Sequence, residues 1–351
     1  MSGDTHRGPR RGVIGLDAGG TKTDGALATL DGHVVARARG GPGNYQSIGV
    51  EAAGRVYSRV IGELLERADA EGVQVEAAAF GLAGHDRPKD ALVLDELIAE
   101  LLPSVAARVV VNDTFLVLRA GSPQGHGVAV VSGTGSNCCG VAPDGRDTRI
   151  GGLGWEFGDG AGAGDLGVEA VRAAFRGEDG RGAPTRLSAL IRLRFKLDRL
   201  DDLVDYHLAD APAPAPPAGL LAPLVFEAAC AGDAVSIGIL EAAGRELALS
   251  AVRVAERLFT PADSFPLVLG GSVLQLGGHD AMRVALIDAV HARFPGANPV
   301  VLEASPLAGA LLLALDRVLR PARPAPDAGA RVTATLATPR RPALAGALET
   351  P

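Results

Sequence analysis

Hydrophobic and polar positions alternate along this chain in two ways, as short apolar runs and as longer stretches with helical spacing. The short runs are bounded by glycine or polar turns, which is typical of buried strands. These runs lie near residues 13–16, 77–82, 109–111, 128–131, 265–269 and 300–302. Between them, apolar side chains recur every three or four positions over residues 49–70, 94–101, 233–259, 279–294 and 306–319. Strands that alternate with helices in this way predict an α/β fold.

One strand and turn pattern occurs twice. An apolar strand runs into Asp-Ala-Gly-Gly-Thr-Lys-Thr at residues 17–23, and the next strand ends in Asp-Gly at 31–32. Later, an apolar strand runs into Ser-Gly-Thr-Gly-Ser at 132–136, and the strand after it ends in Asp-Gly at 144–145. The repeat indicates two halves of similar fold, and a cleft between such halves is the natural place for a ligand.

The two ends of the chain differ in composition from its body. Arginines gather there among Pro, Ala, Gly and Thr residues, which favours solvated disorder. At 351 residues the chain suits two domains of ordinary size. We therefore expect a disordered leader over 1–11, an N-terminal domain over 12–120 completed by a helix over 306–320, a C-terminal domain over 121–305, and a disordered tail over 321–351.

Composition limits the partners and the location. The formal charge of -7 argues against nucleic acid, whose phosphates would be repelled. The three cysteines, two of them adjacent, suit neither a disulfide framework nor a zinc site, which indicates a reducing, cytoplasmic location. No signal segment is found, and no apolar run approaches the roughly 18 residues that a membrane span needs. We expect a soluble protein with no membrane partner.

The two glycine-rich turns offer unhindered backbone N–H groups and hydroxyls, which are the donors that phosphate oxygens require. We expect Asp17 to hold Mg²⁺ through water, since magnesium gives up its water reluctantly. A plain hairpin turn is the alternative for each turn, while the P-loop is excluded because Thr21 stands where that motif requires glycine before Lys22. The residues expected to bind a polyphosphate are Asp17, Gly19, Gly20, Thr21, Lys22, Thr23, Ser132, Gly133, Thr134, Gly135 and Ser136.

Asp113 is the candidate for chemistry. It follows the apolar strand at 109–111, and ligands of open α/β sheets bind at the carboxyl ends of strands. A carboxylate there can accept the proton of a hydroxyl that attacks phosphorus. It could also be the N-cap of a helix over 114–120, and the two roles are compatible. Asn44 and Asp159 lie in glycine-rich loops, where they could bind sugar hydroxyls or stabilise their own backbone.

Taken together, these motifs resemble the N-acetylglucosamine kinase and BadF/BadG-type ATPase family, a branch of the actin-like, sugar-kinase and heat-shock ATPase superfamily. The resemblance covers residues 12–320. It implies two ribonuclease-H-like domains that close over ATP and a sugar, often within a homodimer. The resemblance assigns Gly270, Gly271 and Ser272 to the binding of adenosine. It assigns Asn44, Asp113 and Asp159 to the binding of the sugar, with Asp113 as the catalytic base.

The chain departs from the family pattern in one stretch. Where the family has Gly-Gly-Trp-Gly and Gly-Asp-Glu-Gly-Ser, this chain has Gly-Gly-Leu-Gly at 151–154 and Gly-Asp-Gly-Ala-Gly at 158–162. An aromatic side chain, an acid and a hydroxyl are missing. This indicates that the phosphate-binding motifs are intact, whereas the sugar-binding residues are altered. Related ATPases with an iron-sulfur cluster are disfavoured because the three cysteines lack a ligand pattern.

The resemblance implies ATP-dependent phosphorylation of an amino sugar or N-acetyl amino sugar at its 6-hydroxyl, with Mg²⁺ at Asp17. Two other functions stay open on the sequence. A BadF-type ATPase could act as a nucleotide switch that activates a partner protein. The other open function is a catalytically silent sugar sensor. It is disfavoured because the segment before Val13 is too short for a DNA-binding helix-turn-helix.

Overall fold

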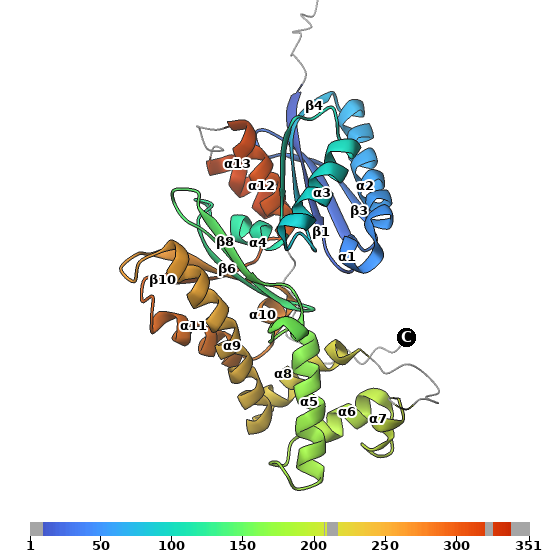
Figure 1. Ribbon diagram of the computed structural model, residues 1–351, viewed down its shortest axis with the longest axis vertical. Coiled ribbons are helices and arrows are strands. Elements are labelled where there is room, and N and C mark those ends of the chain that lie inside the picture. Colours follow the sequence, from blue (N-terminus) through green and yellow to red (C-terminus); the bar gives the residue numbers. More distant parts are fainter. Residues whose placement is uncertain (1–9, 207, 209–216, 320–325, 338–351) are drawn as a thin grey trace, which may run out of the picture. The chain divides into compact units, whose positions relative to one another are not determined.

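The computed structural model describes residues 10–206, 208, 217–319 and 326–337. The described residues fall into two compact units. The first contains the residues up to Gly127 and those from Leu302 onward, and the second runs from Val128 to Val301. Each unit has a five-stranded sheet with helices packed on it (Figure 1), which confirms the predicted mixed α/β fold.

Five strands form the first sheet, and they are β1 (Arg10–Ala18), β2 (Thr23–Thr29), β3 (Val34–Gly40), β4 (Val73–Leu82) and β5 (Ala107–Val111). Their order across the sheet is β3-β2-β1-β4-β5. β1, β2 and β3 are antiparallel neighbours, while β4 and β5 continue the sheet in parallel with β1. The carboxyl ends of β1, β4 and β5 therefore meet at one edge, where ligands of such sheets bind.

Helices cover both faces of the first sheet (Figure 1). They are α1 (Tyr45–Ile48), α2 (Val50–Ala70), α3 (Pro88–Leu101), α4 (Thr114–Gly121), α12 (Pro306–Leu319) and α13 (Pro326–Thr335). α2 and α3 share one core with the sheet, in which Leu64, Phe80 and Leu94 are fully buried. α12 packs on β1, β4 and β5 and also contacts α4. The helices expected over 49–70 and 306–319 are thus confirmed.

α12 approaches α4 closely at Gly309, where a Cβ would lie 1.9 Å from the carbonyl oxygen of Leu116. Gly309→Ala is expected to lower the free energy of unfolding by about 1–3 kcal/mol, because the two helices must move apart. Gly62→Ala in α2 is the matched control, since a Cβ there meets no atom within 4 Å, and it should stabilise by about 0.5–1 kcal/mol. Urea unfolding followed by circular dichroism checks both variants, and equal stabilities would contradict the close approach.

The second sheet repeats the plan of the first. Its strands are β6 (Gly127–Ser132), β7 (Ser136–Val141), β8 (Asp147–Gly151), β9 (Phe265–Gly270) and β10 (Ala297–Val301). Read from β8, their order is β8-β7-β6-β9-β10, which matches the first sheet strand for strand. The two Asp-Gly turns also correspond, because Gly32 and Gly145 have φ values of +86° and +90°. The duplication inferred from the sequence is therefore present in the fold.

Helices and short turns complete the second unit. They are α5 (Ala163–Glu178), α6 (Leu187–Phe195), α7 (Asp202–Asp205), α8 (Ala222–Cys230), α9 (Ala234–Leu258), α10 (Ser272–Leu276) and α11 (Ala281–His291), with 3₁₀ turns at Trp155–Phe157 and Ala218–Leu221. α9 packs on β7 and β8 and along α11. The helices expected over 233–259 and 279–294 correspond to α9 and α11. Among the described residues no helix could span a bilayer alone, although Ala218–Cys230 and Ala234–Leu258, bent by 119°, together have the required length and composition.

The first strand begins earlier than the sequence predicts. β1 includes Arg10 and Arg11, which pair in parallel with β4 and form ion pairs with Glu71 and Glu76, respectively. The expectation of a disordered leader is therefore wrong for residues 10–11, because each arginine has a carboxylate partner in the fold. The rest of the expected leader lies outside the described residues.

α13 lies where the sequence analysis expects a disordered tail over 321–351. Ala328, Val332 and Leu336 are buried, and their four-residue spacing places them along one helical face. The expectation is therefore wrong for residues 326–337, because this apolar stripe packs even though the segment as a whole is rich in Pro and Arg. The other residues of the tail lie outside the described part of the chain.

Candidate functional site

The first glycine-rich turn joins β1 to β2 and is open to solvent. Gly20, Thr21 and Lys22 are exposed, and a Cβ placed at Gly20 would meet no atom within 4 Å. A hydrogen bond of 2.9 Å from the amide of Gly19 to the carbonyl oxygen of Lys22 closes the turn. This open backbone is compatible with the expected phosphate site.

Thr23 braces this turn from inside. Its side chain is fully buried, and its hydroxyl donates a hydrogen bond of 3.0 Å to the carbonyl oxygen of Gly41. The amide of Gly43 donates to the carbonyl oxygen of Gly19, 2.9 Å away. Thr23 thus ties the turn to the loop that carries Asn44, a role that differs from the direct phosphate contact expected of it.

Asp24 is the partner of Lys22. Lys22 Nζ lies 2.6 Å from one carboxylate oxygen of Asp24, and Arg39 Nε lies 2.5 Å from the other. Burial alone would raise the pKa of Asp24, but the hydrogen bonds from Lys22 and Arg39 hold the pKa below its ordinary value. Lys22 therefore compensates a buried carboxylate, and it could bind a phosphate only by leaving or sharing this ion pair.

Asp17 and Asp113 lie at the edge where the parallel strands end. Asp17 is near the carboxyl end of β1, and Asp113 lies just beyond β5. Burial, and then the negative charges of Asp113 and Asp24, raise the pKa of the Asp17 carboxyl to about 7, while the charge of Lys22 opposes this rise. Such a concentration of negative charge favours a bound cation.

The edge fits a hydrated Mg²⁺ better than a metal held by protein alone. Within the residues that the structure describes, no three His, Cys, Asp or Glu side chains are arranged to hold a metal directly. Mg²⁺ usually keeps several waters and uses one or two carboxylates together with phosphate oxygens. Burial and the charges of Asp113 and Asp24 raise the pKa of the Asp17 carboxyl, and the charge of Lys22 offsets this only in part. Asp17 is therefore a suitable residue to hold the ion.

Asn112, which the sequence analysis does not single out, begins helix α4. Its side-chain oxygen accepts a hydrogen bond of 3.0 Å from the amide of Thr114, and its Nδ2 donates to Asp86, also at 3.0 Å. Asp113 occupies the N-cap position of α4, as the sequence suggests, but its side chain makes no capping hydrogen bond, and the side chain of Asn112 supplies one instead. The signal for Asn112 is its place between a buried strand and a helix, where Asn caps well.

Asn44 begins the short helix α1. Its Oδ1 accepts a hydrogen bond of 3.0 Å from the amide of Gln46, which is the backbone-stabilising role left open by the sequence. A Cβ placed at Gly84 would lie 2.7 Å from the same oxygen, so Asn44 lies against the loop that follows β4. The amide NH₂ of Asn44 is the group that could face a sugar.

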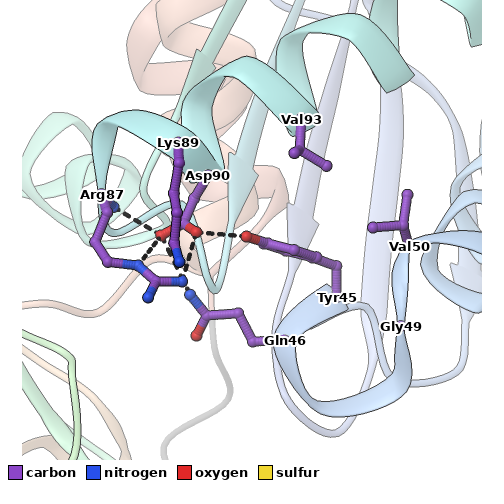
Figure 2. A pocket seen from close by; sticks show the side chains of 8 residues that line it. All are labelled: Tyr45, Gln46, Gly49, Val50, Arg87, Lys89, Asp90 and Val93. Atoms are coloured by element: carbon purple, nitrogen blue, oxygen red, sulfur yellow. Dashed lines mark hydrogen bonds and ion pairs between the residues drawn. The ribbon is translucent and has the colours of Figure 1, made fainter.

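A pocket of about 440 Å³ opens beside α1 (Figure 2). It is lined by Tyr45, Gln46, Gly49, Val50, Arg87, Lys89, Asp90 and Val93. Asp90 is fully buried and accepts hydrogen bonds from the Tyr45 hydroxyl at 2.5 Å and from the Arg87 guanidinium at 2.7 and 2.9 Å (Figure 2). Gln46 Nε2 donates to the carbonyl oxygen of Gly84 at 3.0 Å. The network joins α1, and therefore Asn44, to the start of α3.

Asp90→Asn is expected to lower the free energy of unfolding by about 1–3 kcal/mol at pH 7, because the Arg87 and Tyr45 donors lose their carboxylate. The hydrogen bonds from Arg87 hold the pKa of Asp90 well below its usual range. A depressed pKa stabilises the fold above the pKa of the unfolded chain, and this stabilisation is lost as the pH falls through the lower folded value. The difference from wild type should therefore shrink below about pH 4.

Chemical unfolding at pH 7 and at pH 3.5 measures this effect of Asp90. Asp95→Asn, an exposed position in the same helix, is the control and should leave stability unchanged. If the free energy of unfolding at pH 7 falls no more in the Asp90 variant than in the control, the stabilising role of the Asp90 network is contradicted.

The second glycine-rich turn, between β6 and β7, has the same division between buried and exposed residues. Thr134 and Gly135 are exposed, and a Cβ at Gly135 would meet no atom within 4 Å. Ser132 is fully buried, and its hydroxyl donates to the carbonyl oxygen of Ala161 at 2.6 Å. Ser132 therefore shapes the turn from below, as Thr23 does in the first unit.

The segment expected to bind adenosine lies against this second turn. Gly271 has a φ of +86°, and a Cβ there would lie 2.2 Å from the carbonyl oxygen of Ser132, so the position requires glycine. A Cβ at Gly133 would lie 4.0 Å from both the amide nitrogen and the hydroxyl of Ser272. The structure thus brings Ser132, Gly133, Gly271 and Ser272 together within one unit.

Asp159 stabilises the loop in which it lies. Its Oδ2 accepts hydrogen bonds from the amides of Leu153 and Gly154, both at 2.6 Å. This is the backbone-stabilising role that the sequence left open, and contact with a sugar stays a prediction.

The candidate residues form two groups, one in each unit. The first unit holds the turn after β1 together with Asn44, Asp17 and Asp113. The second holds the turn after β6, residues 270–272 and Asp159. Convergence of the two groups on one triphosphate stays a prediction.

The chain is an α/β protein with two sheets of the same strand order, and in each sheet a glycine-rich turn follows the central strand, β1 or β6. The particular family follows from comparison with known proteins. The chain belongs to the BadF/BadG/BcrA/BcrD ATPase family, whose model matches residues 14–314.

Relatives and solved structures agree with this membership. An N-acetylmuramic acid/N-acetylglucosamine kinase of Clostridium acetobutylicum is 35% identical over 262 residues, which cover 75% of this chain and 85% of the relative. An N-acetyl-D-glucosamine kinase of Dictyostelium discoideum is 29% identical over 313 residues, which cover 86% and 97%. The solved structure of a provisionally assigned N-acetylglucosamine kinase from Chromobacterium violaceum matches with a TM-score of 0.64 and 26% identity, over 87% of this chain and 99% of that one.

Proposed function

We propose that the protein is an ATP-dependent sugar kinase that phosphorylates an amino sugar or N-acetyl amino sugar. The carboxylate pair Asp17 and Asp113, next to an open glycine-rich turn, is the observation that carries this proposal. Membership in the family and the two kinases named above support the class of substrate. The 6-hydroxyl is the proposed acceptor, on the resemblance to the family.

Each group of residues has a distinct role in this proposal. Asp113 accepts the proton of the sugar hydroxyl as its oxygen attacks the γ-phosphorus of ATP. Mg²⁺, held by Asp17 through water, would neutralise charge on the phosphate oxygens. The turns at 19–22 and 132–136 donate backbone N–H groups to phosphate oxygens, and residues 270–272 border the adenosine.

Asn44 and Asp159 complete the proposed sugar site. Asn44 offers its NH₂ group to a sugar hydroxyl, since its Oδ1 is engaged by the backbone. Asp159 keeps one carboxylate oxygen on the amides of Leu153 and Gly154 and can present the other to the sugar. A homodimer in the cytoplasm, with no nucleic acid and no membrane as partner, stays the expectation from the sequence.

ADP release in the presence of ATP and Mg²⁺ tests the proposal. The acceptors are N-acetylglucosamine, N-acetylmuramic acid, glucosamine, N-acetylmannosamine and glucose. At least one hexosamine should raise ADP release well above the rate without sugar, and phosphorus NMR of the product should show a 6-phosphate. A rate that no sugar raises would contradict the proposal.

A nucleotide switch that activates a partner protein is the second candidate. The side chains of Asn44 and Asp159 both accept hydrogen bonds from backbone amides of nearby residues, Gln46 and Leu153, respectively, as they would in a protein that binds no sugar. ATP turnover that is independent of every hexosamine in the same assay would favour the switch.

A further inference from the structure

The pocket beside α1 and the start of α3 (Figure 2) has no ligand in the function proposed above. Its volume of about 440 Å³ falls within the range of sites that bind small ligands. Two cationic side chains, Arg87 and Lys89, line it together with the buried carboxylate of Asp90. We call this pocket, with the lining residues given above, the α1–α3 pocket.

The Asp90 carboxylate is fully engaged by donors other than Lys89. One of its oxygens accepts from the Tyr45 hydroxyl at 2.5 Å and from Arg87 Nη2 at 2.7 Å. The other accepts from the amide of Arg87 at 2.8 Å, from Arg87 Nε at 2.9 Å and from Gln46 Nε2 at 3.3 Å. A carboxylate offers about four lone-pair sites, so these donors leave none for a further cation. The charges of Asp90 and Arg87 therefore compensate each other.

Lys89 gives the α1–α3 pocket an excess positive charge. In the part of the chain that the structure describes, Asp90 pairs with Arg87 and no ion pair includes Lys89. Lys89 is therefore the uncompensated charge among the residues that line the pocket. One excess positive charge attracts a monoanion, whereas the second charge of a phosphate would have no counter-ion there.

The other end of the α1–α3 pocket is apolar. Figure 2 shows Val50 and Val93 at one end of the pocket, and Arg87 and Lys89 at the other. The two valines are 39% and 36% exposed, respectively, so a ligand would remove apolar surface from water. The chemistry that matches both ends is a carboxylate on a short carbon stem.

The α1–α3 pocket adjoins Asn44, which is the residue of the first unit proposed to offer its NH₂ group to the sugar. Asn44 Oδ1 accepts from the amide of Gln46 at 3.0 Å, and Gln46 lines the pocket. Gln46 Nε2 donates to the carbonyl oxygen of Gly84, and a Cβ at Gly84 would lie 2.7 Å from Asn44 Oδ1. A substituent on a sugar bound at Asn44 therefore has the pocket within reach.

We propose that the α1–α3 pocket binds a carboxylate that the acceptor sugar carries on a short carbon stem, with Lys89 as the counter-ion. This inference rests on the proposed kinase function and adds to it a residue that selects among acceptors. Val50 and Val93 contact the carbon stem, while Arg87 stays paired with Asp90. A free small carboxylate has the same chemistry, and the experiment distinguishes the two sources.

Three acceptors test the role of Lys89 in steady-state kinetics of the full-length protein. N-acetylmuramic acid carries a lactyl carboxylate, its methyl ester keeps the substituent without the charge, and N-acetylglucosamine lacks the substituent. In wild type, kcat/KM should be about fivefold higher for the acid than for the ester, which is the size of effect expected of an exposed ion pair. Lys89→Met, which keeps a side chain of similar length, should bring this ratio to about 1.

Two further variants are controls for charge and for place. Lys89→Arg keeps the positive charge, and its acid-to-ester ratio should stay within about twofold of wild type. Arg67→Met removes an exposed cation of α2 that does not line the pocket, and it should keep the wild-type ratio. A ratio that falls as far in Arg67→Met as in Lys89→Met would overturn the assignment to Lys89.

Calorimetric titration measures binding without turnover. N-acetylmuramic acid should bind wild type about fivefold more tightly than it binds Lys89→Met. Lactate added alone is the free form of the same group, and it should give no heat of binding at concentrations of N-acetylmuramic acid that saturate the protein. Lactate that binds as tightly as N-acetylmuramic acid would overturn the proposal in favour of a separate small carboxylate.

The outcomes separate this inference from the function on which it rests. ADP release stimulated by N-acetylglucosamine, combined with equal kcat/KM for the acid and its ester in wild type, would overturn the carboxylate site and leave the kinase intact. Binding of N-acetylmuramic acid that depends on Lys89, without ADP release for any sugar, would uphold the carboxylate site and count against the kinase.

Discussion

Replacing Asp113 by asparagine is expected to lower the turnover number by about 10²-fold or more. The substitution keeps the size of the side chain and removes its capacity to accept a proton from the sugar hydroxyl. Because the side-chain hydrogen bond to the start of helix α4 comes from Asn112 and not from Asp113, the variant should fold normally. Steady-state ADP release with the preferred sugar measures the effect, and calorimetric titration with ATP should give nearly the wild-type affinity.

Asp69→Asn is the matched control for this substitution, since Asp69 is exposed in α2 and distant in sequence from the site. Its turnover should equal that of wild type. Turnover of the Asp113 variant close to wild type would remove Asp113 from the role of base. Equal losses of turnover and of ATP affinity would point instead to damage in the nucleotide site.

Asp17→Asn is expected to have the second large effect, with turnover again lower by about 10²-fold or more, because the residue proposed to hold hydrated Mg²⁺ loses its charge. The Mg²⁺ concentration for half-maximal activity should rise. ADP release measured over a series of Mg²⁺ concentrations gives both values. An unchanged Mg²⁺ requirement would contradict the metal role of Asp17.

The same Asp17 variant should be more stable than wild type at alkaline pH. The folded pKa is raised to about 7 by burial and by the charges of Asp113 and Asp24, whereas the pKa in an unfolded chain is about 4. The contribution of Asp17 to stability is therefore complete below about pH 4 and is lost as the pH rises through 7. Without ATP and Mg²⁺, the melting temperature of the variant should exceed that of wild type at pH 8, and the gap should narrow at pH 5.

The sequence predicted the fold well where local signals and packing agree. The repeated turn sequences at 17–23 and 132–136 indicated two similar halves, and the two sheets have the same strand order. Helical spacing over 49–70 and 233–259 was sufficient to predict these two helices, because the apolar stripe of each one faces a core. The helix at 326–335 was missed because the tail in which it lies, over 321–351, is rich in Pro and Arg. Few apolar residues are buried there, namely Ala328, Val332 and, just beyond the helix, Leu336.

The sequence located the candidate residues but not the contacts that support them. Residue types and spacing located the open turns and the strand-end carboxylate Asp113. They could not separate Thr23 and Ser132, which are buried and brace the turns, from the exposed hydroxyls of Thr21 and Thr134. The hydrogen bonds that decide this division join residues far apart in the chain, so short motifs do not contain them.

The first unit is built from segments far apart in the sequence, because α12 packs on β1. The two are in intimate contact, since a Cβ at Gly15 would lie 2.7 Å from the amide nitrogen of Leu311. During translation, one face of the first sheet consequently lacks its helix until residues 306–319 have left the ribosome, whereas the second unit, which runs from Val128 to Val301, can fold earlier. The edge that bears Asp17 and Asp113 is thus completed last, although its strands are synthesised first.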